Sequence, residues 1–205
     1  MSLEPGYGET PLDFEEIEAL LPEIRAEIDA SNKAEIYDLE QEVQSAVAED
    51  FTNRVLGGEL RLDDLLTDLF LRQLHARLYG QIWTWGGQYR SAELNIGVAP
   101  ELVAVEIRSA MDNILFRYNE TSDFDAKALG VVTHAEIVRV HPFADGNGRC
   151  SRLFADLVYL AAQDGTQIQV FDWNLDKNRY IELLREYDAH RDPHDLARFI
   201  RTVAL

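Results

Sequence analysis

The stretch HPFADGNGRCSR, residues 141–152, interrupts a helical pattern and concentrates polar and flexible residues in one loop. Gly146 and Gly148 stand where this loop would join a new helix that begins near Arg149, and glycine there allows positive φ and close approach to a ligand. The N–H groups and the dipole at a helix N-terminus favour an anion. The pattern therefore predicts a phosphate-binding loop.

Charged residues beside the loop add further chemistry. Arg149 and Arg152, three residues apart on the first turn, would offer two guanidinium groups to separate phosphates of a triphosphate. Asp145 would hold Mg²⁺ through one carboxylate while the phosphates supply further oxygens. His141 is suited to take a proton from an attacking hydroxyl. Singly, these residues are also typical of turns and helix caps, so the hypothesis depends on their combined order and spacing.

Composition limits the classes of partner. The 205-residue chain is 46% hydrophobic, which suits one domain with an appended arm, and its net charge is −18. Residues 1–50 hold fifteen acidic and two basic residues, or −13 of that charge. An acidic surface disfavours direct binding to nucleic acid or to a membrane. With the single cysteine Cys150, no apolar run of about 18 residues and no signal sequence, we expect a soluble cytoplasmic protein.

Apolar residues recur at helical spacing along most of the chain, which predicts an all-α fold. The predicted helical segments lie within 13–51, 60–83, 101–120, 124–140, 149–165, 176–188 and 194–203. Glycines and short alternation over 87–98 predict a small β-hairpin or extended flap, ended by Pro100. We expect an acidic N-terminal helical arm at 1–60 and the main domain at 61–205.

The loop resembles the signature of the Fic family, H-x-F-x-[D/E]-G-N-G-R-x-x-R. Its specified positions are all filled, by His141, Phe143, Asp145, Gly146, Asn147, Gly148, Arg149 and Arg152. The segments LHARLYGQIWTWGGQYR (74–90) and VVTHAEIVRVHPF (131–143) extend the resemblance, and the family-like body spans roughly 64–201. The segments TPLD and ALLP, with the acidic helix after them, are also similar to a bacterial Fic subgroup known as mobile mystery protein B.

The resemblance implies a Fic-type helical bundle that transfers AMP from ATP, with Mg²⁺, to a Ser, Thr or Tyr hydroxyl of a target protein. It implies His141 as the base, Asp145 as the Mg²⁺ ligand, Phe143 as an anchor of the loop and Arg152 at the γ-phosphate. The remaining phosphate contacts would come from Gly146, Asn147, Gly148 and Arg149. The phosphorylating Doc branch has lysine in place of Gly148, so AMP transfer is favoured, although other nucleotide diphosphate substrates stay open.

Two further expectations concern docking and restraint. By resemblance, the segment AELNIGVAP (92–100) would hold the target by strand addition, through Asn95, Ile96, Gly97 and Val98. Many Fic proteins carry an inhibitory pattern [S/T]-x-x-x-E-[G/N]. SNKAEI supplies Ser31 and Glu35 but has Ile36 at the last position, and SAVAED (45–50) is a second imperfect match. Because an acidic helix contains Ser-x-x-x-Glu by chance, a separate antitoxin protein is the alternative source of restraint.

Three classes of function are therefore compared. The first is a protein adenylyltransferase. The second is a catalytically silent or antitoxin-restrained Fic-like nucleotide-binding module, and the third is an unrelated all-α phosphate binder. The intact His141 argues against a silent module, and the breadth of the resemblance argues against the third class.

Overall fold

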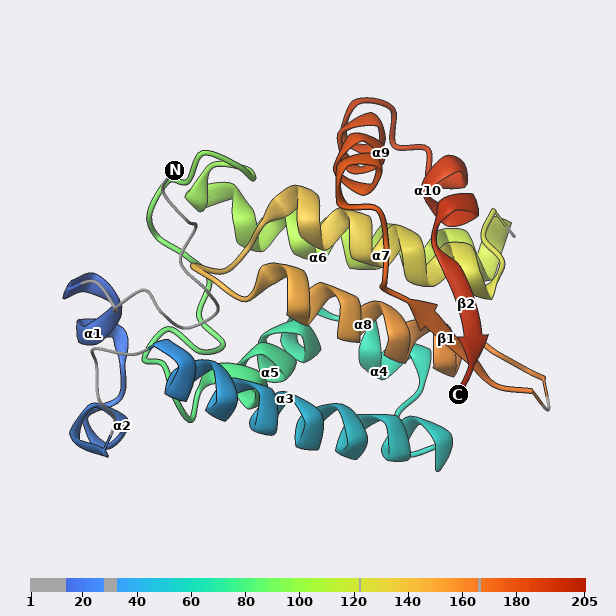
Figure 1. Cartoon of the computed structure of the whole chain (residues 1–205). Coiled ribbons are helices and arrows are strands. Elements are labelled where there is room, and N and C mark those ends of the chain that lie inside the picture. The colour runs from blue at the N-terminus through green and yellow to red at the C-terminus, as the bar shows by residue number, and fades with distance from the viewer. Residues whose placement is uncertain (1–13, 28–32, 122, 166) are drawn as a thin grey trace, which may run out of the picture.

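The computed structural model describes residues 14–27, 33–121, 123–165 and 167–205, and within them the chain is mostly helical (Figure 1). The helices are α1 (Phe14–Ala19), α2 (Pro22–Glu27), α3 (Lys33–Leu56), α4 (Leu62–Leu65), α5 (Asp68–Tyr79), α6 (Val103–Phe116), α7 (Ala126–Val140), α8 (Asn147–Ala161), α9 (Lys177–His190) and α10 (His194–Phe199). A 3₁₀ turn, η1 (Pro100–Leu102), precedes α6, and a π-helical turn, η2 (Arg117–Thr121), follows it. Two strands, β1 (Gln169–Asp172) and β2 (Arg201–Ala204), complete the fold.

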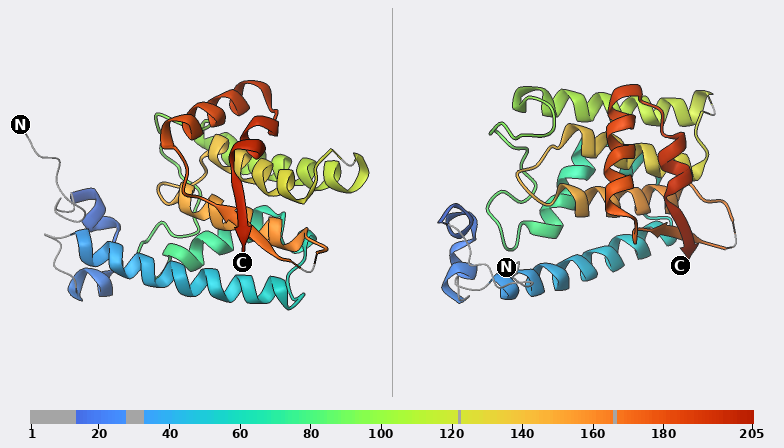
Figure 2. Two further views of the ribbon diagram at one scale, coloured as in Figure 1. Left: turned by 45° about the vertical axis from the view of Figure 1, so that its right-hand side comes forward. Right: turned by 45° about the horizontal axis from the view of Figure 1, so that its top comes forward.

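Helices α7 and α8 pack side by side at the centre of the bundle (Figure 1). Helix α6 covers α7, whereas α3 and α5 cover α8. Helix α9 packs across α7 on the side of the bundle away from α3 (Figure 2). Every residue from 129 to 137 of α7 is buried, as expected for a helix with small or apolar side chains around most of its circumference. The loop that joins α7 to α8 is therefore carried by the two most enclosed helices.

The predicted class, helical with one small antiparallel pair of strands, is confirmed, but the strands lie elsewhere in the chain. β1 pairs antiparallel with β2, from Gln169 opposite Ala204 to Asp172 opposite Arg201. The segment 87–98 contains no strand and is instead a loop with several bends, which we call the flap. The predicted helix over 194–203 ends at Phe199, because the following residues pair with β1.

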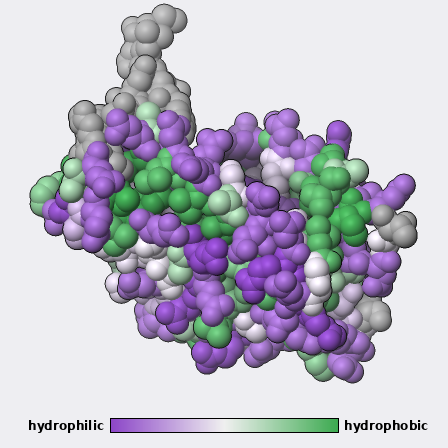
Figure 3. Space-filling view, turned by 90° about the horizontal axis from the view of Figure 1, so that it is seen from below, coloured by the Kyte–Doolittle hydropathy of each residue, from purple (hydrophilic) through white to green (hydrophobic). Residues whose placement is uncertain are grey.

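Helix α3 shares the core of the main body. Val47, Phe51 and Val55 of α3 are buried in the same apolar cluster as α5 and α8, and the Phe51 and Phe70 rings meet edge to face at 5.3 Å. The face seen from the α3 side is largely hydrophilic, with separate apolar areas (Figure 3). In the described ranges, no helix has both the length and the apolarity needed to cross a bilayer.

Candidate active site

The loop between α7 and α8 changes direction at two left-handed residues. Asp125 caps the start of α7 by accepting from the Ala128 N–H at 2.7 Å. The helix ends at Val140, and the next residue, His141, has φ 53°, an uncommon conformation for a residue with a side chain. Gly146, with φ 73°, precedes the first residue of α8. The histidine and the start of α8 therefore lie at the two ends of one short loop.

Asn147 and Phe143 fix the shape of this loop. The Phe143 N–H donates to Asn147 Oδ1 at 2.9 Å, and Asn147 Nδ2 donates to the Phe143 carbonyl at 2.8 Å. Phe143 is fully buried and stacks on the His75 ring, with centroids 3.6 Å apart, so it anchors the loop as predicted. Because the Asn147 amide bonds within the loop, a phosphate would meet its backbone N–H.

The start of α8 has the geometry of an anion cradle. The first helical hydrogen bond runs from the Cys150 N–H to the Gly146 carbonyl at 2.9 Å. The N–H groups of Asn147, Gly148 and Arg149 precede that bond and belong to the helix terminus, where donors and dipole favour an anion.

The two glycines of the signature have different roles. Gly146 requires glycine, because its φ is positive and a Cβ there would lie 2.5 Å from Cε2 of Tyr79. The expected positive φ at Gly148 is wrong, because Gly148 is already a helical residue of α8. A Cβ on Gly148 would lie 3.5 Å from Nη1 of Arg152, an ordinary contact. The cradle there is open because the side chain is absent, not because the backbone is unusual.

Asp145 is exposed beside the cradle, and one of its carboxylate oxygens and its backbone carbonyl are hydrogen-bonded within the protein. Its Oδ1 accepts from the Gly146 N–H at 2.6 Å, and its carbonyl lies 3.1 Å from His75 Nε2. His75 Nδ1 accepts from the Gly87 N–H at 2.9 Å, so Nε2 carries the proton that is donated to Asp145. Burial lowers the pKa of His75 to about 4, which keeps this ring neutral.

The donor set at Asp145 fits a Mg²⁺ ion held jointly with phosphates. The described residues contain no group of three or more His, Cys, Asp or Glu side chains that could enclose a metal. Asp145 has a second carboxylate oxygen on an exposed side chain, next to the cradle. Mg²⁺ is commonly bound through one or two carboxylates together with substrate oxygens.

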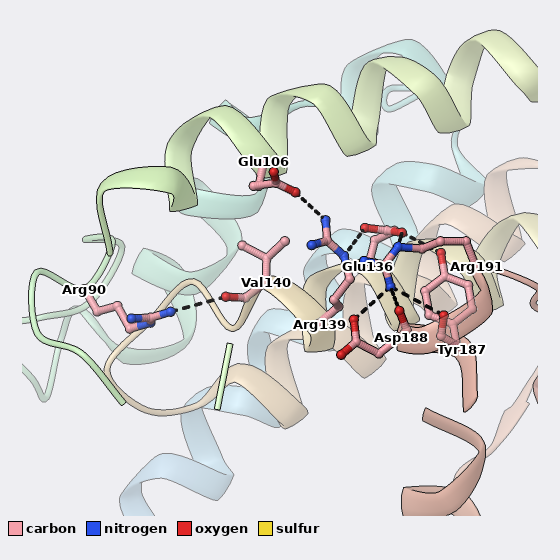
Figure 4. Close-up of polar contacts among 8 residues, drawn as sticks. All are labelled: Arg90, Glu106, Glu136, Arg139, Val140, Tyr187, Asp188 and Arg191. Carbon is pink, nitrogen blue, oxygen red and sulfur yellow. Dashed lines mark hydrogen bonds and ion pairs between the residues drawn. The ribbon is translucent and has the colours of Figure 1, made fainter. Parts of the chain in front are cut away.

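Arg90 joins the flap to the end of α7. Its buried guanidinium donates to the carbonyls of His141 at 2.7 Å and Ala92 at 3.0 Å, and also to that of Val98. A further bond to the Val140 carbonyl measures 3.4 Å (Figure 4). Arg90 belongs to the family-like segment 74–90, but the sequence pattern indicates no role for it because its partners lie up to 51 residues away along the chain.

The flap passes directly over the histidine. Gly97 has φ 91°, and a Cβ there would lie 2.6 Å from Cβ of His141. The Val98 N–H donates to the Val140 carbonyl at 3.3 Å, so this donor is already used within the chain. Asn95 and Ile96 are exposed, with 53% of Ile96 accessible. Of the four predicted docking residues, Gly97 is exposed too and Val98 is half-buried, so Asn95 and Ile96 are the exposed positions that carry side chains.

A polar network holds the second half of α7, the helix that directly precedes His141. Glu136 accepts from the Tyr187 hydroxyl at 2.6 Å and from Arg139 Nε at 2.8 Å (Figure 4). Arg139 also donates to Glu106 of α6 at 2.7 Å. These contacts tie α7 to α6 and α9 and so fix the position of its C-terminal end.

The electrostatic surroundings of His141 favour a neutral imidazole. Burial, followed by the positive charge of Arg90, lowers its pKa below the ordinary 6.5, although the Val138 backbone and Asp145 oppose this shift. A neutral imidazole at neutral pH has a lone pair with which to accept a proton. His141 therefore meets the requirement for a general base.

The two signature arginines turn to different sides of α8. Arg149 pairs with Glu40 of α3. Arg152 lies beside the Tyr180 hydroxyl of α9, which forms a 2.5 Å hydrogen bond with His134 Nε2. His134 is fully buried, and this burial lowers its pKa to about 3.

The predicted inhibitory residues are placed only in part. Ser31 lies outside the described residues, and Glu35 is exposed in the first turn of α3. Among the described residues, a different α3 carboxylate, Glu40, pairs with a signature arginine, Arg149. The helical period explains the difference, because Ile36 and Glu40 share the buried face whereas Glu35 faces outward.

Comparison with known proteins agrees with this geometry. The model of the Fic/DOC family matches residues 65–159. A Fido domain-containing protein of Dictyostelium discoideum is 30% identical over 125 residues, which cover 56% of this chain and 82% of that protein. The chain therefore belongs to the Fic/DOC family.

Two further relatives extend the comparison. Protein adenylyltransferase fic-1 of Caenorhabditis briggsae is 30% identical over 107 residues, which cover 50% of this chain but 20% of that longer protein. Among solved structures, the BepC effector of Bartonella tribocorum with bound AMPPNP has a TM-score of 0.61 at 15% identity, covering 85% of this chain and 90% of its own. The structural likeness confirms the fold.

Proposed function

We propose that this protein transfers AMP from ATP to a Ser, Thr or Tyr hydroxyl of a target protein. The observation that carries the proposal is the juxtaposition of a neutral His141, held by Arg90, with the anion cradle at the start of α8. The adenylyltransferase names of the relatives and the AMPPNP in the BepC structure support this proposal.

In this proposal, the cradle and the arginines bind the triphosphate. The N–H groups of Asn147, Gly148 and Arg149 contact the α- and β-phosphates, as their place at the helix terminus suggests. Arg152 contacts the γ-phosphate, and Asp145 holds Mg²⁺. The ion, when bound, neutralises charge on the phosphate oxygens.

The chemical step is an exchange of bonds at the α-phosphorus. The target hydroxyl oxygen forms a bond to this phosphorus while the bond to the α–β bridging oxygen breaks. The hydroxyl proton goes to His141, and pyrophosphate leaves with the electron pair of the broken bond. The product is a phosphodiester that joins AMP to the target, and His141 becomes neutral again by releasing its proton to solvent.

The flap would hold the target. We assign this role to Asn95 and Ile96, which are exposed, with Gly97 allowing close approach to His141. Main-chain pairing would place the target hydroxyl beside the base and would recognise shape more than sequence. Val98 would support the flap from inside, since its N–H bonds to Val140.

We also propose a cytoplasmic protein whose activity is restrained, either internally through Glu35 or by a separate antitoxin protein. The acidic charge and the absence of a membrane-spanning helix in the described ranges agree with this setting. A catalytically silent nucleotide-binding module is the alternative function.

Parallel reactions with α-labelled and γ-labelled ATP test the proposed function. The protein is incubated with Mg²⁺ and a bacterial lysate, and labelled bands are resolved by electrophoresis. Label from α-labelled ATP alone is expected. Label from γ-labelled ATP alone would indicate phosphoryl transfer, and no label from either, with ATP binding intact, would indicate the silent module.

A further inference from the structure

Glu40 of α3 is a buried carboxylate at the edge of the cradle. Its side chain is 3% exposed, and its Oε1 accepts from the Trp83 indole N–H at 2.7 Å. Its Oε2 accepts from Nη1 of Arg149 in the first turn of α8. Both carboxylate oxygens therefore have charged or polar donors, which makes their geometry well defined.

Aromatic rings complete the support of Arg149. The guanidinium carbon lies 5.2 Å from the centroid of the fully buried Tyr79 ring, which packs against Gly146. Trp83 stacks on Trp85 at 5.4 Å, and Trp85 lies 5.6 Å from the His75 ring. Through Trp83, Glu40 is thus joined to the aromatic cluster that packs against the loop between α7 and α8.

Two effects of Glu40 on phosphate binding are compared: competition with phosphate for Arg149, and support of Arg149 in its position. The burial of the Glu40 carboxylate distinguishes them. A phosphate that displaced Glu40 from Arg149 would leave a carboxylate enclosed by protein without its cation, which is strongly unfavourable. If the pair stays intact, Glu40 uses only Nη1 of Arg149, and within the described residues the other N–H donors of the guanidinium remain available for a ligand. The second arrangement is the one that the buried geometry favours.

We propose that Glu40, supported by Trp83, is a positioning residue that holds Arg149 at the cradle for phosphate binding. This inference rests on the proposed nucleotide function. It adds that α3, which lies wholly outside the segment matched by the family model, contributes to the phosphate site. Glu40 does not itself contact the nucleotide and acts through Arg149.

The test compares affinities for ATP and adenosine by isothermal titration calorimetry on the full chain. Glu40→Gln keeps the shape of the side chain but removes its charge, and about a tenfold loss of ATP affinity is expected. Adenosine affinity should stay unchanged, because adenosine has no phosphate. Glu49→Gln, an exposed substitution on the same helix, is the matched control and should bind both ligands as the wild type does.

A double-mutant cycle shows whether Glu40 acts through Arg149. Arg149→Met keeps an aliphatic side chain over Tyr79, and adding Glu40→Gln to it should cause no further loss of ATP affinity. Trp83→Phe removes the indole donor and should weaken ATP binding in the same direction but by less. If Glu40→Gln does not fold, the ATP affinity of Trp83→Phe gives the test.

The opposite results would overturn the inference. ATP affinity equal to wild type in Glu40→Gln would show that Glu40 has no positioning role. Tighter binding would show that Glu40 competes with phosphate, and equal losses for ATP and adenosine would show general structural damage. Failure of the wild-type protein to bind ATP would instead remove the proposed function, and this inference with it.

Discussion

Gly97 lies directly against His141, so the flap passes this histidine with no side chain between them. A Cβ on Gly97 would be 2.6 Å from the Cβ of His141 and 2.8 Å from the Val140 carbonyl oxygen. The φ of 91° at Gly97 also belongs to the region that favours glycine. Close approach and backbone conformation both require glycine here.

Gly97→Ala should therefore displace the flap or the histidine. We expect AMP transfer to fall by at least about tenfold and the free energy of unfolding to fall by about 1–3 kcal/mol. Gly58→Ala is the matched control, because Gly58 also has positive φ but has open space at its Cβ position. Equal effects of the two substitutions on transfer would show that backbone strain, not contact with His141, is responsible.

Ile96→Pro tests docking of the target on the flap. Proline removes a main-chain donor that strand addition would use, so labelling of a protein target should be abolished while ATP affinity is retained. Ile96 is the better position for this test than Val98, whose N–H bonds to Val140 and supports the flap itself. Undiminished labelling of the target by Ile96→Pro would refute strand addition at this position.

The rate of AMP transfer should depend on pH through His141. Burial and Arg90 lower the pKa of its imidazole, so the neutral, active form is present down to a lower pH than for an ordinary histidine. A profile of kcat/KM against pH should rise through an inflection below 6.5 and then level off. An inflection above 6.5 would be inconsistent with the environment described for His141.

Tyr180→Phe tests the buried pair of Tyr180 and His134. Removing the hydroxyl leaves His134 Nε2 without the partner that it has at 2.5 Å, and a buried polar atom left without a hydrogen bond costs about 1–3 kcal/mol. Urea unfolding should show a loss of that size. Tyr118→Phe, on a partly exposed tyrosine outside this cluster, serves as the control and should be near neutral.

Substitution of α3 glutamates tests internal restraint. If Glu35 restrains the enzyme, Glu35→Gly should raise AMP transfer or self-modification, whereas Glu49→Gly should leave the initial rate unchanged. The initial rate is measured with α-labelled ATP for both variants. No change in either variant would assign the restraint to a separate antitoxin protein or to the target.

Local sequence patterns predicted the helices and the loop but not the contacts between distant segments. The 3.6-residue period marks the buried faces of α5 and α8, α7 is apolar around most of its circumference, and the signature marks His141 and the cradle. Arg90 and Glu40 were missed as site residues because their partners lie 51 and 109 residues away. No local period encodes such pairs.

The predicted position of the strands and the predicted positive φ at Gly148 were wrong because contacts outside the local pattern decide both. Apolar and polar residues alternate in the flap as they do in a strand. However, the carbonyls of Ala92 and Val98 accept hydrogen bonds from the Arg90 guanidinium, and 87–98 forms no strand. β1 and β2 are short and are separated by α9 and α10, so no turn between them signals their pairing. Gly148 is helical because Gly146 already supplies the left-handed residue that precedes α8.

The most direct test of the central claim measures AMP transfer and ATP affinity together in wild type and His141→Ala. Transfer from α-labelled ATP in the presence of Mg²⁺ is followed with time, and ATP affinity is measured by calorimetry. Removing the base should lower transfer by about 10²–10⁴-fold, while ATP affinity stays close to that of the wild type because the cradle is intact. Equal transfer by wild type and His141→Ala would contradict the assignment of His141 as the general base.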